Sequence, residues 1–155
     1  MKKTAAICLT AIFSFCLLTG CSNPANDSLK DGTYRAEMST ESHGYKDYVE
    51  IKVLNGKIDT VVYDSVTQDG KKKSDDENYK KSMMDGNKNA NLPETYPADY
   101  MKKLSQSLVE HQDIEKVDAI AGATTSSNDF KTLVNALKNN MKNGKTKTIV
   151  VDNSK

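Results

Sequence analysis

The sequence has few of the residues on which most site chemistry depends. Its 155 residues include no Trp, 3 Phe, 2 His and 3 Cys, and all the Cys lie within the first 21 positions. Arg35 is the single arginine. So few Cys and His give little support for a metal centre, and one arginine does not favour bidentate recognition of phosphates. The core must be built from aliphatic side chains, with the 7 Tyr at its margins.

Net charge and polarity narrow the class of protein further. The 22 basic residues nearly balance the 21 acidic ones, for a net charge of +1, so no electrostatic argument favours nucleic acid as a partner. Hydrophobic residues make up 37% and charged residues 28% of the chain, which is typical of one globular domain. No Ser–His–Asp set or close pair of carboxylates indicates hydrolysis.

Residues 1–20 predict a lipoprotein signal peptide. A basic start precedes an apolar run over 5–18, which is too short to span a bilayer. The run ends in Leu18-Thr19-Gly20-Cys21, which resembles the bacterial lipobox. The resemblance implies cleavage before Cys21 and a diacylglycerol on its sulfur, and more than one acyl chain holds a protein stably on a lipid bilayer. The alternative is an ordinary secretory signal in which Cys21 is incidental.

Residues 21–30 are small and polar, and they predict a tether between the lipidated Cys21 and a folded domain over 31–152. This organisation places the domain on the extracytoplasmic face of the cell membrane. Cys8 and Cys16 leave with the signal peptide, and Cys21 is alkylated. Disulfides and thiol catalysis are therefore excluded in the mature protein.

The chain from 48 to 64 predicts a β-hairpin. Residues 48–54 alternate between apolar and polar side chains, and Asn55-Gly56 follows, which is typical of a type I′ turn. A two-residue turn pairs Val53 with Ile58, Ile51 with Thr60 and Val49 with Val62, and on the other face Lys52 with Asp59 and Tyr48 with Tyr63. Further strands are expected over 33–40 and 146–151.

Three helices complete the expected architecture. A short helix is predicted over 75–84, before a loop over 85–93. Pro97 suits the first turn of a helix over 97–112. Ser126 or Ser127 can cap a helix over 126–141 that Gly144 ends, with Asp129 in its first turn. The sequence therefore predicts an α+β fold: a small antiparallel sheet with two or three packed helices.

The segment 117–127 differs from the rest of the chain. It is a run of small residues that carries no charge after Asp118 and leads into a helix N-terminus. Unpaired N–H groups and the positive end of the helix dipole favour an anion there, most often a phosphate. Four hydroxyls, on Thr124, Thr125, Ser126 and Ser127, lie within reach. A tight turn with a helix cap explains the same residues without any ligand.

Asp118-x-x-Ala121-Gly122-Ala123-Thr124 resembles the flavinylation motif of the FMN-binding domain family. That family includes domains of sodium-pumping NADH–quinone reductases and Rnf-type complexes, and extracellular lipoproteins of Gram-positive bacteria. The resemblance extends over roughly 31–137, and within the family this sequence is similar to the lipoprotein branch. The other stretches that carry it are Asp31–Tyr34, His43–Lys46, Asn55–Ile58, Tyr79 with Met83, Leu108–Gln112, and Phe130 with Leu133.

The resemblance implies a covalently bound FMN. A flavin transferase would use FAD as donor and join FMN through its phosphate to the Thr124 hydroxyl, with Asp118, Gly122, Ala123, Thr125 and Ser126 around it. The family usually has Ser or Thr where this chain has Ala121, a departure that leaves the acceptor intact.

The function that the resemblance implies is electron transfer rather than catalysis by the chain itself. FMN does the redox chemistry, and the protein holds and tunes it. Electrons would arrive from a membrane NADH dehydrogenase through quinone and leave to an extracellular acceptor such as ferric iron. The alternatives are a non-redox surface-binding lipoprotein on the same fold, and a protein that binds FMN non-covalently.

Some residues allow both a structural and a functional interpretation. His43 lies in a predicted turn and is either a surface histidine or a flavin contact, with the first favoured. Tyr45, Tyr48 and Tyr63 suit stacking on a flavin ring as well as ordinary sheet packing. His111, near the end of a helix, is expected to be structural. The run 71–73 of three lysines is expected to be a solvated loop.

Overall fold

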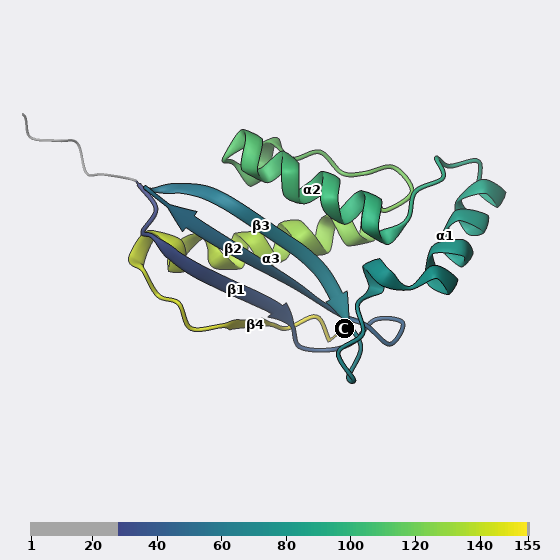
Figure 1. Cartoon of the computed structure of the whole chain (residues 1–155), viewed down its shortest axis with the longest axis horizontal. Coiled ribbons are helices and arrows are strands. Elements are labelled where there is room, and N and C mark those ends of the chain that lie inside the picture. The colour runs from purple at the N-terminus through teal and green to yellow at the C-terminus, as the bar shows by residue number, and fades with distance from the viewer. Residues whose placement is uncertain (1–27, 155) are drawn as a thin grey trace, which may run out of the picture.

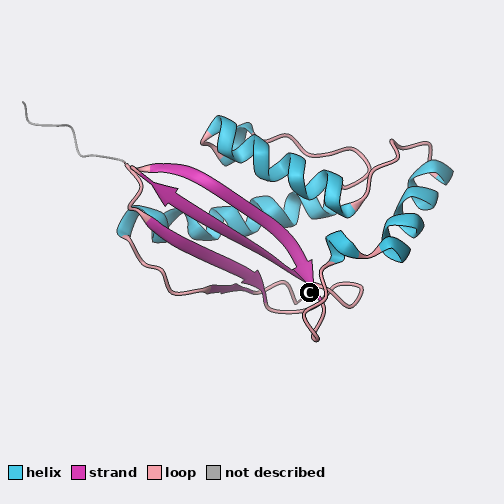
Figure 2. Ribbon diagram, in the orientation of Figure 1, coloured by secondary structure: helices cyan, strands magenta, loops and turns pink. Residues whose placement is uncertain are grey.

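The computed structural model describes residues 28–154, and the predicted signal peptide, Cys21 and most of the tether lie outside that range. The described chain is an α+β fold (Figures 1 and 2). None of its helices is long and apolar enough to cross a membrane. Its strands are β1 (Gly32–Met38), β2 (Lys46–Leu54), β3 (Lys57–Val66) and β4 (Ile149–Val151). Its helices are α1 (Glu77–Asn89), α2 (Pro97–His111) and α3 (Thr124–Asn143), and η1 (Lys73–Asp75) and η2 (Ile114–Lys116) are 3₁₀ turns.

The four strands form one sheet in the order β3-β2-β1-β4. β1, β2 and β3 are antiparallel, as the sequence predicts, but β4 runs parallel to β1, with Ala36 opposite Ile149. The path of α3 explains the difference. The Lys30 N–H donates to the Met141 carbonyl, so α3 ends where β1 begins. A strand that follows α3 must then run in the direction of β1.

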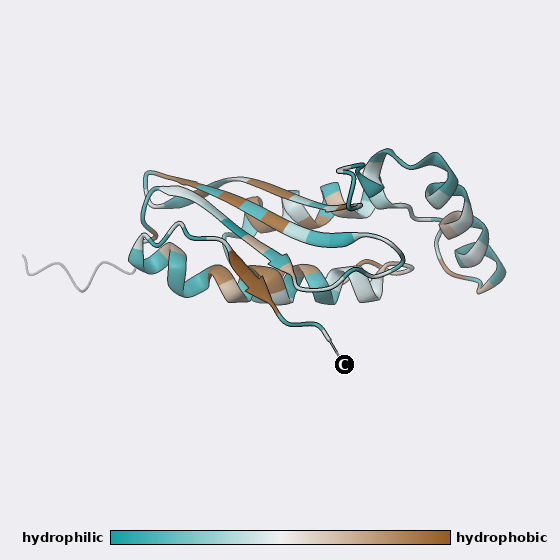
Figure 3. Cartoon of the chain, turned by 90° about the horizontal axis from the view of Figure 1, so that it is seen from below, coloured by the Kyte–Doolittle hydropathy of each residue, from teal (hydrophilic) through white to brown (hydrophobic). Residues whose placement is uncertain are grey.

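One face of the sheet and the two long helices enclose the core. Along β1 the side chains of Tyr34, Ala36 and Met38 point inward and are buried, while the residues between them are partly exposed. Figure 3 shows α3 lying along one side of the sheet. The apolar side chains that recur at helical spacing in both helices are buried: Tyr100, Met101, Leu104 and Leu108 on α2, and Phe130, Leu133, Val134, Leu137 and Met141 on α3.

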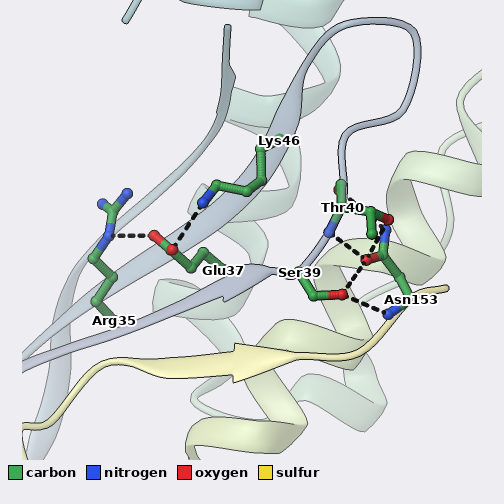
Figure 4. A network of polar contacts seen from close by, with 6 residues as sticks. All are labelled: Arg35, Glu37, Ser39, Thr40, Lys46 and Asn153. Carbon is green, nitrogen blue, oxygen red and sulfur yellow. Dashed lines mark hydrogen bonds and ion pairs between the residues drawn. The ribbon is translucent and has the colours of Figure 1, made fainter. Parts of the chain in front are cut away.

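The outer face of the sheet is charged. Glu37 accepts from Lys46 at 2.9 Å and lies 3.5 Å from Arg35 (Figure 4). The Arg35 guanidinium also lies 4.0 Å from the centre of the Tyr48 ring. The hydrogen bond from Lys46 is the main reason why the pKa of Glu37 is lowered. This face is therefore a solvated surface, as its polar alternation requires.

Hydrogen bonds to C-terminal residues hold the segment that directly follows β1. The Ser39 N–H donates to the Val151 carbonyl at 2.8 Å, and the Thr40 N–H donates to the Asn153 side-chain oxygen at 2.9 Å. The Ser39 hydroxyl also donates to that oxygen at 3.1 Å (Figure 4). These bonds continue the short parallel pairing beyond β4, and β1 itself ends at Met38, two residues before the predicted end.

The Asn55-Gly56 hairpin is confirmed, with φ of 53° and 74° at its two turn residues. Val53 pairs with Ile58 as predicted, but the rest of the predicted register is wrong. A bulge between Lys52 and Val53 shifts every pair farther from the turn by one residue relative to the prediction. The bulge turns Val61 and Tyr63 into the core and leaves Val62 39% exposed, because α2 and the core accept those two side chains rather than Thr60 and Val62.

Helix α1 is longer than the sequence predicts. It begins at Glu77, after Asp76 caps the Tyr79 N–H at 2.8 Å, and it continues to Asn89 through residues expected to form a loop. Local propensity disfavours a helix there. The buried Asn87 side chain compensates, because its amide donates to the carbonyls of Thr95 at 3.4 Å and Gly122 at 3.3 Å. The hydrogen bonds of Asn87 to distant residues thus outweigh the low helix propensity of this segment.

Candidate functional site

A groove of about 240 Å³ lies at the N-terminus of α3. Figure 1 shows this end of α3 on the side of the molecule where α1 lies, away from the start of β1. Separate segments of the chain contribute its lining: Ser42, His43, Asp47, Lys73, Tyr79, Met83, Gly122, Ala123, Thr124, Thr125, Ser126 and Asp129. Five of the six residues predicted around a flavin are among them. The sixth, Asp118, is exposed on the loop before the groove and does not line it.

A tight turn over residues 120–123 precedes α3 at the groove. The Ala123 N–H donates to the Ile120 carbonyl at 2.9 Å, and Gly122 has a φ of 81°, which matches the third position of a type II turn. A Cβ on Gly122 would lie only 2.9 Å from the side chains of Asn87 and Thr95. Both the backbone angle and the close approach therefore require glycine at this position.

The N-terminus of α3 has no side-chain cap, although the sequence predicts one. The helix begins at Thr124, two residues before the predicted start, and Ala123 is the capping residue. The Ser127 N–H donates to the Ala123 carbonyl at 2.9 Å. Thr124, Thr125 and Ser126 occupy the positions whose N–H groups have no partner inside a helix, and no other acceptor within residues 28–154 takes them. Helix α1, by contrast, is capped by a carboxylate.

The four predicted hydroxyls have different surroundings. Ser127 is buried, and its hydroxyl donates to the Ala123 carbonyl at 2.9 Å and accepts from the Ile120 N–H at 3.0 Å. It therefore ties the loop to the helix instead of capping it. Ser126 donates to the Tyr100 hydroxyl at 3.2 Å. Thr124 and Thr125 are exposed, and neither hydroxyl bonds to a described residue. The geometry thus leaves two accessible hydroxyls.

The floor of the groove is a buried polar cluster at the end of the sheet. The Tyr63 hydroxyl lies 2.8 Å from the Asp47 carboxylate and 2.8 Å from the Ser126 carbonyl, and the Ser65 hydroxyl also donates to Asp47. Burial is the main reason why the pKa of Tyr63 is raised well above its usual value. This cluster links β2, β3 and the first turn of α3, so it fixes where the open helix terminus stands.

Lys73 contradicts the expectation of a solvated lysine run. Its neighbours Lys71 and Lys72 are exposed, but Lys73 begins η1 and only 5% of it is exposed. Its ammonium lies 5.1 Å and 4.8 Å from the ring centres of Tyr45 and Tyr79. Desolvation lowers the pKa of the Lys73 ammonium. The sequence does not predict this 3₁₀ turn, which places the Lys73 side chain in the lining of the groove.

Asp129 is a half-buried carboxylate in the groove wall. Burial, and then the nearby Asp47, raise the pKa of Asp129, while Lys73 opposes the shift. A carboxyl group whose pKa is higher in the folded than in the unfolded state destabilises the fold above its folded pKa. That cost disappears when the pH falls below the ordinary pKa of an aspartate.

We therefore expect Asp129→Asn to stabilise the protein at pH 7 by about 1 kcal/mol or less, since solvent screens a half-exposed charge. The gain should vanish at about pH 3, where the wild-type carboxyl is protonated in both states. Urea unfolding at the two pH values measures it. The exposed Asp85→Asn on α1 controls for the loss of one negative charge. An equal gain at both pH values would contradict this account.

The two histidines of the chain have different surroundings. His43 has a φ of 53° and lines the groove, with its Nδ1 3.1 Å from the Ser42 hydroxyl. The structure therefore brings this histidine to the site. His111 contacts Ser107 on its own helix, as expected of a structural residue. A larger groove of about 570 Å³ between β3 and α2 contains Tyr63 but none of the six residues predicted around the FMN.

The tyrosines are arranged differently from the prediction. Tyr48 pairs with Asp64 rather than with Tyr63 and stacks with Arg35 on the outer face. Tyr45 donates to Asp76 at 2.5 Å, and this hydrogen bond is the main reason why the pKa of Tyr45 is raised to about 12. Tyr79 also lines the groove, although it is not among the residues predicted for the site.

Several residues of the groove carry no local signal in the sequence. Asp47, Lys73 and Asp129 lie on a strand, a 3₁₀ turn and a helix, and each could equally be a solvated charge. Tyr79 and Met83 lie four residues apart on α1, and this helical spacing of two apolar side chains is the one local sign. The fold alone brings these residues to the segment 122–126.

The fold and the groove define a class of protein: a small α+β ligand-binding domain whose open helix terminus suits an anion. The profile of the FMN-binding domain family matches residues 43–139. The chain is 30% identical over 146 residues to the 15 kDa lipoprotein of Treponema pallidum (strain Nichols), with 94% of each chain covered. The chain belongs to the FMN-binding domain family.

A solved structure agrees with this assignment. The crystal structure of the CPE2226 protein from Clostridium perfringens is 35% identical and has a TM-score of 0.73. The match covers 81% of this chain and 99% of that chain. Almost the whole of that solved chain therefore corresponds to the domain described here.

The hydrogen-bond donors that line the groove suit the phosphate of FMN. The unpaired N–H groups of the first turn of α3 suit a phosphate group, and the exposed Thr124 and Thr125 stand at the same place. Tyr79 and Met83 provide a wall that an aromatic ring can contact. FMN is thus the cofactor that both the family and these residues support.

Proposed function

We propose that this protein is a membrane-anchored electron-transfer flavoprotein that carries FMN on the Thr124 hydroxyl through a phosphoester. The observation that carries the proposal is the uncapped N-terminus of α3, where an exposed threonine hydroxyl adjoins three unpaired N–H groups. A phosphate ester at this position would receive hydrogen bonds and the favourable helix dipole. When bound, FMN supplies the electron transfer that the side chains do not.

The roles of the chain's own residues follow from their contacts. Gly122 lets the backbone turn sharply before the helix, and Ser127 locks that turn to α3. The network of Asp47 and Tyr63 holds the first turn of the helix against the sheet. These residues position the acceptor hydroxyl and its N–H groups. None of them needs to act as an acid, a base or a nucleophile toward a substrate.

The placement of the termini supports a role at a membrane surface. Lys30 is bonded to Met141 near the end of α3, whereas the groove lies at its beginning. A 20-residue helix is about 30 Å long. A chain anchored through Cys21 would therefore attach at one end of the domain and present the groove at the other. The relative that is itself a lipoprotein adds support for this anchoring.

The same arrangement suits partners on the extracytoplasmic side of the membrane. We propose a flavin transferase with FAD as the modifying partner, a quinone-linked NADH dehydrogenase as the source of electrons, and an extracellular acceptor such as ferric iron. A covalent bond has a clear advantage outside the cell, because an FMN that dissociated there would be lost.

The test is the intact mass of the chain from Ser22 onward, produced with and without a flavin transferase and an FAD supply. We expect an added mass of one FMN less one water only with the transferase, and a yellow colour that survives denaturation. Colour that denaturation releases would mean a non-covalent FMN protein. An unmodified, colourless protein, beside a transferase active on another substrate, would favour the non-redox binding lipoprotein.

A further inference from the structure

The buried Lys73 ammonium has no ionic partner in the described part of the chain. Its side chain lines the groove with only 5% exposed, and its contacts are the rings of Tyr45 and Tyr79. No carboxylate of residues 28–154 lies within 4.0 Å of it, and no hydrogen bond reaches it. A lysine is almost never buried unless it is paired.

Three carboxylates act electrostatically on Lys73, but none forms an ion pair with it. Asp47 is bonded to Tyr63 and Ser65, and Asp64 accepts from the Ser74 hydroxyl at 2.7 Å. Both act on Lys73 only through space, as does Asp129. The fold thus keeps a positive charge in the groove wall, and none of these three carboxylates forms an ion pair with it. An anionic ligand is the partner that this arrangement lacks.

We propose that Lys73 is the counter-charge for the phosphate of FMN in this groove, opposite the open N-terminus of α3. The inference rests on the proposed function of the site but not on the covalent bond. Two independent features favour a phosphate there: three unpaired N–H groups on one wall and an unpaired ammonium on another. A neutral ligand would leave the N–H groups without a charged acceptor and the ammonium without an ionic partner.

The proposal is tested by non-covalent binding to the unmodified chain from Ser22 onward, which contains every residue that the structure describes. FMN and riboflavin differ only in the phosphate, so each is titrated by the change in flavin fluorescence. We expect Lys73→Met to weaken FMN binding by about tenfold or more, the usual loss for a hydrogen bond to a charged group. Riboflavin binding should change by less than about twofold.

Two further variants complete the design. Lys72→Met removes the same charge from an exposed neighbour and should leave FMN binding unchanged, which separates a local contact from net charge. Lys73→Arg keeps the positive charge and should retain more FMN affinity than Lys73→Met. An equal loss for FMN and riboflavin, or no loss for FMN, would overturn the proposal.

A stability comparison covers the case in which free FMN binds too weakly to titrate. In the unmodified chain, Lys73→Met removes a buried unpaired charge and should raise the melting temperature or leave it unchanged. In the transferase-modified chain, the same change should lower it. If the two effects are equal, Lys73 does not contact the attached group. The fluorescence titration is informative even if no covalent FMN is found, so the two proposals can fail separately.

Discussion

Thr124→Ala is expected to abolish covalent flavin completely. The hydroxyl of the exposed Thr124 makes no hydrogen bond to a described residue, and Thr124 is the first residue of α3. Alanine is a good helix former, so the unfolding free energy should change by less than about 0.5 kcal/mol. The intact mass after exposure to the transferase and FAD should be that of the unmodified chain, with no bound colour after denaturation.

Thr125 provides the matched control, because it is the other exposed threonine in the first turn of α3. Thr125→Ala should still gain one FMN, and Thr124→Ser should retain an acceptor hydroxyl and be modified. If Thr125→Ala loses the flavin and Thr124→Ala keeps it, the attachment site is Thr125. If both single variants are modified, either hydroxyl can accept the FMN.

Gly122→Ala is expected to cause the largest loss of stability of any single substitution discussed for the site. The added methyl group would meet Asn87 and Thr95 at 2.9 Å and the Pro93 carbonyl at 3.0 Å, on a backbone with φ of 81°. The positive φ and the overpacking together should lower the unfolding free energy by about 2–4 kcal/mol. Denaturant unfolding measures the loss, and flavinylation should fall as the turn moves.

Gly70 separates the two causes of that loss. Its φ of 82° is nearly the same, but nothing lies within 4 Å of the position that a Cβ would take. Gly70→Ala should therefore lose only the cost of the left-handed backbone, about 1–2 kcal/mol. The difference between the two variants measures the close approach of Gly122 to Asn87 and Thr95. Equal losses would mean that this packing does not constrain the turn.

The site itself could be predicted only where its residues are contiguous. The stretch 122–126 was identified because small residues and hydroxyls before a helix form a recognisable pattern, and five of its predicted residues line the groove. The opposite walls come from residues 42–83 and from Asp129. Lys73 is one of three consecutive lysines, and no property of that run indicates which of them is buried.

The sequence by itself determined the features whose causes are local. Asn55-Gly56 requires the positive φ values of a tight turn, the apolar periodicity of 97–111 specifies the buried face of α2, and Gly144 ends α3 with a φ of 68°. In each case the deciding atoms belong to residues within a few positions of one another, so the free energy of the local conformation fixes the outcome.

Only the tertiary structure decided the hairpin bulge, the parallel pairing of β4, the start of α3 and the burial of Lys73. The bulge follows from which side chains the core accepts, and β4 follows from where α3 returns the chain. Lys73 is buried because η1 packs it against Tyr45 and Tyr79. These outcomes depend on contacts between residues far apart in sequence, whose free energies outweigh local preferences once the core has formed.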